Sequence, residues 1–146
     1  MRARRSSAPV DRPPTAPLNE LSGREPFEVP EQAYAGLRAV LHAVRDRLTV
    51  EEAAHLGAQL PQLVRGIYYE GWRPSMAPND EKTVDEFLAH VRSSLGGNPQ
   101  ERLPLEPATR TILAFLAEHV DPGEMRHVVD QMPKDIKGLF AETPAA

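Results

Sequence analysis

The stretch that decides the fold runs from Leu48 to Trp72 and reads LTVEEAAHLGAQLPQLVRGIYYEGW. Thr49, with Glu52 three residues later, predicts a capped helix start, because the hydroxyl and the carboxylate can both accept hydrogen bonds from free N–H groups there. Pro61 then interrupts the apolar spacing. A proline inside a helix clashes with the preceding turn, so a second helix is expected after it. The pattern therefore predicts two short helices joined at a proline.

A weaker copy of this unit, VDPGEMRHVVDQMPKDIKGLFA, occupies residues 120–141. A shift of 72 residues superimposes residues 34–69 on residues 106–141 without a gap. Seven of the 36 aligned positions are identical: Arg38 with Arg110, Leu41 with Leu113, Glu52 with Glu124, His55 with His127, Gln59 with Gln131, Pro61 with Pro133 and Gly66 with Gly138. Because neither copy alone has a thick apolar core, we expect the two to pack face to face around a pseudo-two-fold axis.

Apolar spacing and helix-start residues predict the remaining helices. The helix that begins at Pro30 places Tyr34 in a buried stripe and Arg45 on the opposite face. The helix after the first joint proline carries Leu63 inward. Other helix starts are predicted at Thr83, Pro107, Asp121 and Pro133. Residues 11–23 (DRPPTAPLNELSG) contain three prolines, so the helix expected there is lost or degraded, which leaves three helices in the first copy and four in the second.

These observations predict an all-α fold, a bundle of about seven helices built from two tandem repeats with a 72-residue offset. Residues 1–29 are rich in proline and arginine and predict a disordered tail. Residues 30–141 are expected to form a single helical domain, with repeat one at 30–72 and repeat two at 83–141. Residues 142–146 are expected to fray.

Composition and charge exclude several classes of protein. There is no cysteine, which rules out disulfides and thiolate metal sites. The net charge is −4, of which residues 1–12 contribute +3, so the remainder carries −7. An acidic body repels the phosphate backbone, and we expect no specific nucleic-acid binding. No apolar run approaches the ~20 residues of a membrane-spanning helix, so a cytoplasmic location without membrane association is predicted.

The motifs resemble a known family. The segment VLHAVRDRLTVEEAAHLGAQLPQLVRGIYYEGW, the segment DEFLAHV and the second copy are similar to the bacterial proteins of domain-of-unknown-function family 2267. The resemblance covers about residues 30–141, and its most specific parts are QLP at 59–61, QMP at 131–133 and YEGW at 69–72. It implies a small helical protein with tandem repeats and supplies no reaction, cofactor or catalytic residue. The degraded first helix departs from the family pattern and would leave a groove that is open or filled by the tail.

Two polar pairs recur in the repeat, His55 with Gln59 and His127 with Gln131. Each pair shares a helix face, and symmetric packing would bring the pairs together. They form either a metal or polar ligand site or, as we favour, caps for backbone groups freed at the proline joints. Glutamine is a poor metal ligand, and no aspartate or glutamate is expected at ligand spacing on that face. The sequence therefore predicts no metal site and no cofactor.

An aromatic cluster distinguishes the end of the first copy. Tyr69, Trp72 and Arg73 are of the residue types that dominate binding hot spots, whereas Tyr68 takes a core position. These three are the candidate interaction residues. The alternative is that Trp72 packs over the end of the first helix pair.

The sequence contains no arrangement of acid, base and nucleophile that predicts catalysis. His42, His90 and His119 are scattered, and none belongs to a His-x-x-x-His or Glu-x-x-His array. We therefore expect a non-enzymatic helical protein that acts through an unknown protein partner or self-association, or as a stress-associated accessory factor. The alternative is a small-molecule or metal-binding regulatory protein that uses a groove between the repeats.

Overall fold

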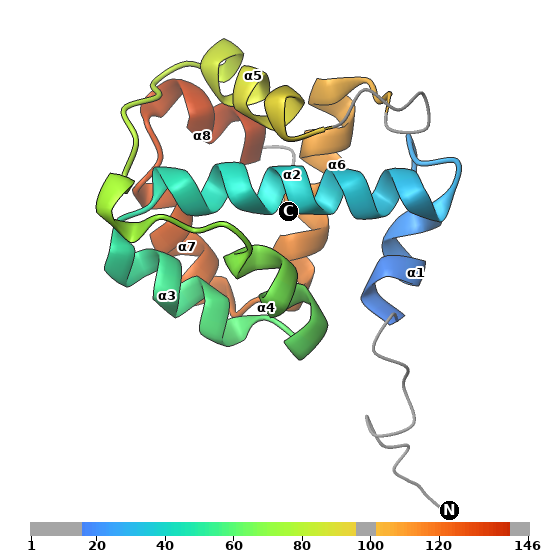
Figure 1. Ribbon diagram of the computed structural model, residues 1–146, viewed down its shortest axis with the longest axis horizontal. Helices are drawn as coiled ribbons and strands as arrows, with labels where there is room; N and C mark the ends of the chain where they lie inside the picture. The colour runs from blue at the N-terminus through green and yellow to red at the C-terminus, as the bar shows by residue number, and fades with distance from the viewer. Residues whose placement is uncertain (1–15, 96–101, 141–146) are drawn as a thin grey trace, which may run out of the picture.

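The computed structural model describes residues 16–95 and 102–140, and these ranges form α-helices without a strand (Figure 1). The helices are α1 (Ala16–Ser22), α2 (Pro30–Arg47), α3 (Val50–Gln59), α4 (Gln62–Tyr69), α5 (Val84–Ser94), α6 (Leu105–His119), α7 (Pro122–Asp130) and α8 (Lys134–Phe140), with a short 3-10 helix η2 (Pro74–Met76) between α4 and α5. The predicted all-α class is confirmed. The described residues hold eight α-helices where about seven were expected, because α1 is present.

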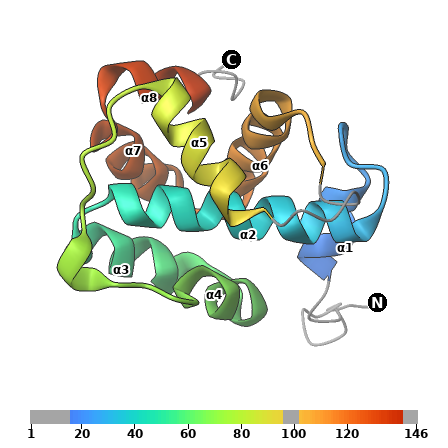
Figure 2. The same cartoon turned by 45° about the horizontal axis from the view of Figure 1, so that its top comes forward.

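Helix α2 is the centre of the fold. Figures 1 and 2 show it crossing the molecule, and helices α1, α4, α5 and α6 pack around it. Gly36 lies at a close approach of α2 to its neighbours, since a Cβ there would lie 3.1 Å from an Ile112 side-chain carbon and 3.2 Å from Phe27. A helix surrounded on several sides has no single buried stripe. The predicted inward position of Tyr34 is therefore wrong, and its side chain is 42% exposed.

Arg45 was expected on a polar face, but only 4% of it is exposed. Its guanidinium donates to the carbonyl oxygens of Tyr68 and Glu70, both at 2.8 Å, and to the Asp46 carboxylate at 2.8 Å. One turn earlier, His42 Nε2 donates to the Ile67 carbonyl oxygen at 2.7 Å. Burial lowers the pKa of His42, so its ring stays neutral at physiological pH. Both polar residues are buried because they satisfy carbonyls at the end of α4.

Helix α1 corrects the expectation of a disordered tail over residues 1–29. Leu21 is fully buried and Phe27 nearly so. Arg24 binds Glu118 through two hydrogen bonds of 2.6 and 2.9 Å, which tie this segment to α6. Pro17 lies in the first turn of α1, where a missing N–H group costs little, so the prolines do not prevent a helix. Residues 16–29 thus belong to the domain, and residues 1–15 lie outside the described residues.

Helix α1 is present where the sequence predicted a lost or degraded helix. Helix α1 ends at Ser22 and α5 ends at Ser94, which is the same position after the 72-residue shift. Within the described part of the chain, α1 packs against α2, so the position on α2 that a missing helix would have left open is filled. Within the described ranges, none of the helices is both long enough and apolar enough to cross a membrane.

The predicted helix ends are mostly confirmed. Thr83 and Glu86 form a reciprocal capping box, and Asp121 caps α7 with its carboxylate. Gly71 follows α4 with a φ of 71°, a conformation that glycine adopts without strain. Helix α6 begins at Leu105, two residues before the predicted start. The expected frayed end at residues 142–146 lies outside the part of the chain that the structure describes.

Leu21→Ala tests whether α1 belongs to the folded domain. Leu21 is fully buried, so its truncation removes apolar contact and leaves a cavity. We expect the free energy of unfolding to fall by about 2–5 kcal/mol in chemical denaturation. Asn19→Ala, on the exposed side of the same helix, is the matched control and should change stability by less than about 0.5 kcal/mol. Equal stability of the two variants would contradict a docked α1.

Candidate functional site

The candidate site lies where α3 and α7 pack against each other. Gln59, the last residue of α3, accepts a hydrogen bond from the backbone N–H of Asp121 at 3.2 Å. Gln131, at the end of α7, accepts one from the backbone N–H of Thr49 at 3.1 Å. Thr49 and Asp121 are the N-caps of α3 and α7, so the two contacts are reciprocal. The glutamines bind backbone groups, as expected, but at the start of the opposing helix rather than at their own proline joint.

These contacts replace half of the capping box predicted for Thr49 and Glu52, and half of the equivalent box that Asp121 and Glu124 could form in α7. The Thr49 hydroxyl accepts from the Glu52 N–H at 3.2 Å, as a cap should. The N-cap N–H of Thr49 donates to Gln131 instead of Glu52. The N-cap N–H of Asp121 donates to Gln59 instead of Glu124. Both glutamate side chains are therefore free to point elsewhere. They lie together between the two helices, with ligand atoms of Glu52, Glu124 and His127 all within 4.8 Å of one another.

The glutamate pair is poorly solvated. Only 7% of Glu52 is exposed, and Glu124 is half-buried. The Oε2 atoms of both have no solvent exposure and no hydrogen-bond partner among the described residues. Burial is the largest cause, and the neighbouring Glu52 carboxyl the second, of a rise in the pKa of Glu124 to about 7. Near neutral pH, therefore, one of the two carboxyl groups is protonated in a fraction of the molecules.

The prediction that no acid lies at ligand spacing on the histidine face is wrong. Glu124 and His127 are three residues apart on one face of α7, and Glu52 approaches them from α3. A sequence signal was present, because each copy contains a Glu-x-x-His motif, Glu52 to His55 and Glu124 to His127. His55 and His127 are both exposed, and His55 lies outside the group of three.

The candidate interaction residues do not form one exposed patch. Tyr69 packs between the rings of Tyr68 and Trp72, with centroid distances of 5.0 and 5.4 Å. Its hydroxyl covers Gly57 of α3 so closely that a Cβ there would overlap it. The indole N–H of Trp72 is buried without a partner among the described residues. Tyr69 and Trp72 are thus partly buried, which favours the packing alternative, and their binding role stays a prediction. Arg73 is exposed.

Tyr68 occupies the predicted core position. It is fully buried, and its hydroxyl donates to the Ala53 carbonyl oxygen at 2.7 Å. Burial raises its pKa above the ordinary value, so the phenol stays protonated.

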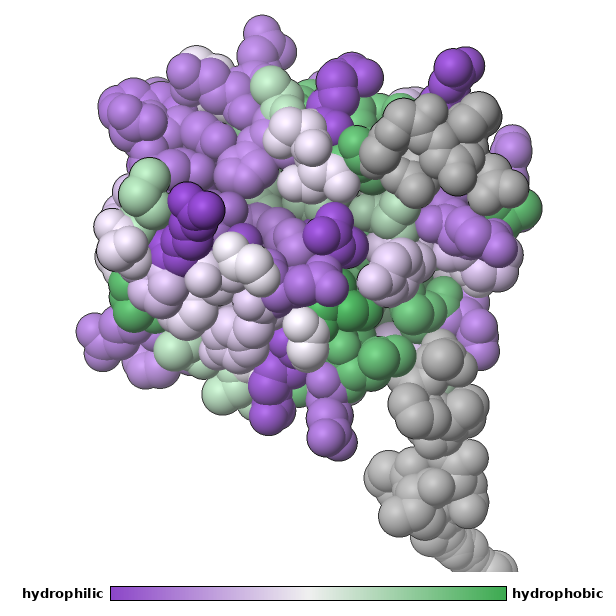
Figure 3. All heavy atoms as spheres, in the orientation of Figure 1, coloured by the Kyte–Doolittle hydropathy of each residue, from purple (hydrophilic) through white to green (hydrophobic). Residues whose placement is uncertain are grey.

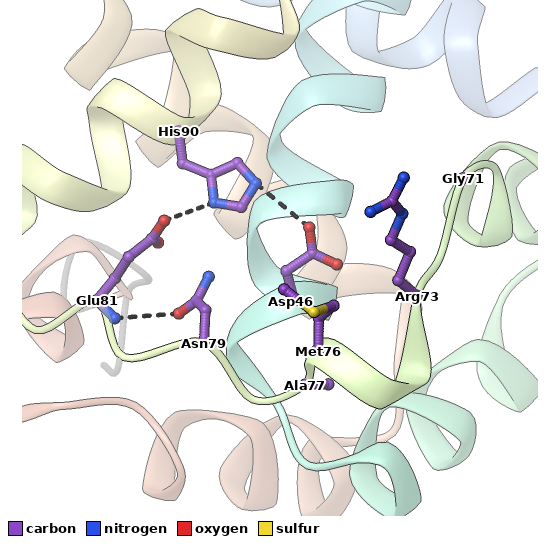
Figure 4. A pocket seen from close by; sticks show the side chains of 8 residues that line it. All are labelled: Asp46, Gly71, Arg73, Met76, Ala77, Asn79, Glu81 and His90. Carbon is purple, nitrogen blue, oxygen red and sulfur yellow. Dashed lines mark hydrogen bonds and ion pairs between the residues drawn. The ribbon is translucent and has the colours of Figure 1, made fainter.

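A second candidate site is a pocket of about 340 Å³ beside α2 and α5 (Figure 4). Its lining residues are Asp46, Gly71, Arg73, Met76, Ala77, Asn79, Glu81 and His90. His90 bridges two carboxylates, with Nδ1 at 2.7 Å from Glu81 and Nε2 at 3.3 Å from Asp46. Figure 4 shows Arg73 beside Asp46, with no interaction drawn to it.

The pocket is better suited to tying the chain together than to catalysis. The hydrogen bond to Asp46 is the largest cause, and the hydrogen bond to Glu81 the second, of a rise in the pKa of His90 to about 9. The ring is therefore an imidazolium at neutral pH. An imidazolium is neither a base nor a metal ligand. None of the lining residues carries a hydroxyl or thiol nucleophile. The backbone N–H of Asn79 also donates to the Asp46 carbonyl at 2.9 Å, so this cluster pins the connection before α5 to the end of α2.

The described helices define an all-α protein with a buried central helix and a polar interface between α3 and α7. The family model described as "Uncharacterized conserved protein (DUF2267)" matches residues 16–139. The chain belongs to this family, which confirms the resemblance seen in the sequence. The match also includes α1, which the sequence had placed in the tail.

Two curated relatives are phosphoglucosamine mutases. The protein of Erythrobacter litoralis (strain HTCC2594) is 30% identical over 104 residues, which is 70% of this chain and 22% of the enzyme. The protein of Novosphingobium aromaticivorans is 30% identical over 99 residues, which is 67% of this chain and 21% of the enzyme. The chain therefore spans about a fifth of the length of the curated relatives it matches.

Gln59→Ala and Gln131→Ala each remove one exchanged cap. We expect each variant to lose about 1 kcal/mol of unfolding free energy, because one N-cap N–H group loses its acceptor. Chemical denaturation provides the measurement. Gln62→Ala, at the exposed start of α4, is the matched control and should be near neutral. A loss in the control as large as in the two variants would contradict the assigned role.

His90 should make stability depend on pH. Its pKa is 6.5 in an unfolded chain and about 9 in the folded protein. Its stabilisation is therefore complete below pH 6.5 and is lost as the pH rises toward 9, amounting to about 1–3 kcal/mol. Comparing wild type with His90→Gln by denaturant titration across this range isolates the effect, since other groups titrate in both proteins. A constant difference between the two at every pH would refute it.

Proposed function

We propose that this chain is a non-enzymatic interaction protein that binds an amphipathic helix of a partner on the apolar face between α1 and α4. One difference between the two repeats carries the proposal. In the second repeat α5 packs against α8, whereas its counterpart α1 packs against α2 and makes at most marginal contact with α4. Apolar side chains gather between α4 and α1 on this face, as Figure 3 shows.

The residues at the equivalent positions support this reading. In the second repeat the Val84 N–H donates to Asp135 Oδ2 at 2.8 Å, and Phe87 is fully buried. The 72-residue shift places Leu63 at the position of Asp135. Leu63 is 37% exposed where an inward position was predicted, and Tyr34 on α2 is 42% exposed. Among residues 16–95 and 102–140, α1 leaves this apolar helix face uncovered, and such a face is the surface that helix-in-groove recognition uses.

We further infer that the two copies are related by a pseudo-two-fold axis between α3 and α7. The reciprocal glutamine contacts support it, since Gln59 and Gln131 exchange under the 72-residue shift. The facing pair of Glu52 and Glu124 also exchanges under this shift. Action in the cytoplasm belongs to the same proposal and is supported by a sequence without cysteine. This chain matches only about a fifth of the mutases, so the match supports no mutase activity for it.

Leu63→Asp tests the binding face, since it introduces the residue type that the second repeat has at this position. A buried carboxylate in an apolar interface is costly, so we expect partner binding or self-association to weaken more than about tenfold. Partners are captured by affinity purification from source cells, and light scattering after size exclusion measures self-association. Because Leu63 is partly exposed, stability should change by less than about 1 kcal/mol.

Val50→Asp is the matched control, because Val50 is 42% exposed and is the first residue of α3, which lies away from α1. It should leave every interaction unchanged. If Leu63→Asp retained all partners and the native mass of the wild type, the proposed face would be excluded.

A further inference from the structure

The interface between α3 and α7 contains a cluster that the proposed interaction does not use. Glu52 on α3 and Glu124 and His127 on α7 place one ligand atom each within 4.8 Å of the others. Glu124 and His127 are three residues apart on a helix, so both side chains project from one face. The cluster is therefore held by helix geometry rather than by loops.

A buried carboxylate oxygen without a partner points to a missing positive group. Glu52 is 93% buried, the complement of its 7% exposure, and its Oε2 accepts no hydrogen bond among the described residues. The Oε2 of Glu124 is likewise buried without a donor among the described residues, although the Glu52 and Glu124 carboxyls can share a proton. No lysine or arginine forms an ion pair with either carboxylate within the described ranges. Buried carboxylates are ordinarily paired or bound to a metal.

We propose that Glu52, Glu124 and His127 bind one divalent transition-metal cation between the two repeats. Two carboxylate oxygens neutralise the charge of such an ion, and an imidazole nitrogen favours zinc, manganese or ferrous iron over magnesium or calcium. Carboxylates and Glu-x-x-His motifs from facing helices form metal sites in other helical bundles. Water completes the coordination, and the exposed His127 leaves a path for the ion.

The exchanged caps explain why these carboxylates are available. Glu52 occupies the capping-box position of α3, and the N-cap N–H that it would otherwise bind is taken by Gln131. Gln59 likewise binds the N-cap N–H of Asp121, which Glu124 would otherwise bind. The ligands are thereby directed into the interface, and the bound ion would join the two repeats.

The test is isothermal titration of the full chain with ZnCl₂, with bound zinc counted by mass spectrometry of the native protein. We expect saturable binding of one ion per chain. Glu124→Gln and His127→Ala each remove one ligand and should weaken the affinity more than about tenfold. MgCl₂ at the same concentration should give no saturable binding, because the imidazole disfavours it.

Two matched controls separate the site from general surface binding. Glu51→Gln changes the exposed neighbouring carboxylate on α3, and His119→Ala changes an exposed histidine on α6. Both should bind zinc as the wild type does. Circular dichroism should show that Glu124→Gln is folded, and zinc should raise the melting temperature of the wild type but not of this variant. The proposal is overturned if zinc fails to saturate, or if Glu124→Gln and His127→Ala bind it with wild-type affinity.

Discussion

The backbone N–H groups at the starts of α3 and α7 govern the interface between the repeats. A helix leaves its first N–H groups without internal partners, and each needs an acceptor. Here Gln131 accepts from the Thr49 N–H and Gln59 accepts from the Asp121 N–H, so α3 and α7 each complete the start of the other helix. This exchange holds α3 against α7 and releases Glu52 and Glu124 from the role that their sequence position predicts.

Backbone carbonyl groups at the C-terminal end of α4 also need partners, and this need explains why α2 buries His42 and Arg45. The carbonyls of Ile67, Tyr68 and Glu70 at the end of α4 accept hydrogen bonds from side chains of α2, the first from His42 and the other two from Arg45. An arginine with 4% exposure is tolerated because its guanidinium has acceptors on several sides, including Asp46. Asp46 in turn accepts from His90, so α4, the connection after it and α5 are all tied to α2.

Local signals predicted the fold well where the determining contact lies within a few residues. The Thr83 cap, the proline joints and the positive φ of Gly71 depend on neighbouring backbone, and the sequence shows them. Arg45 and Tyr34 were misplaced because burial of α2 depends on several distant helices, which periodicity along one helix does not reveal. The Glu52–Glu124 pair was missed because its cause is a glutamine 62 or 82 residues from the helix start that it caps, although the repeated Glu-x-x-His spacing was visible.

Two carboxylates at the centre of an interface repel each other unless they share a proton or a cation. A glutamine at either position could donate to the remaining carboxylate and remove the repulsion. With a pKa of about 7 against 4.5 when unfolded, Glu124 makes the protein less stable as pH rises through that range. Yet only seven of 36 aligned positions are identical between the copies, and the glutamates and the histidines three residues later are among them. A cation that neutralises both carboxylates offsets the electrostatic cost of the pair, and this accounts for acids at both positions where a structural role does not.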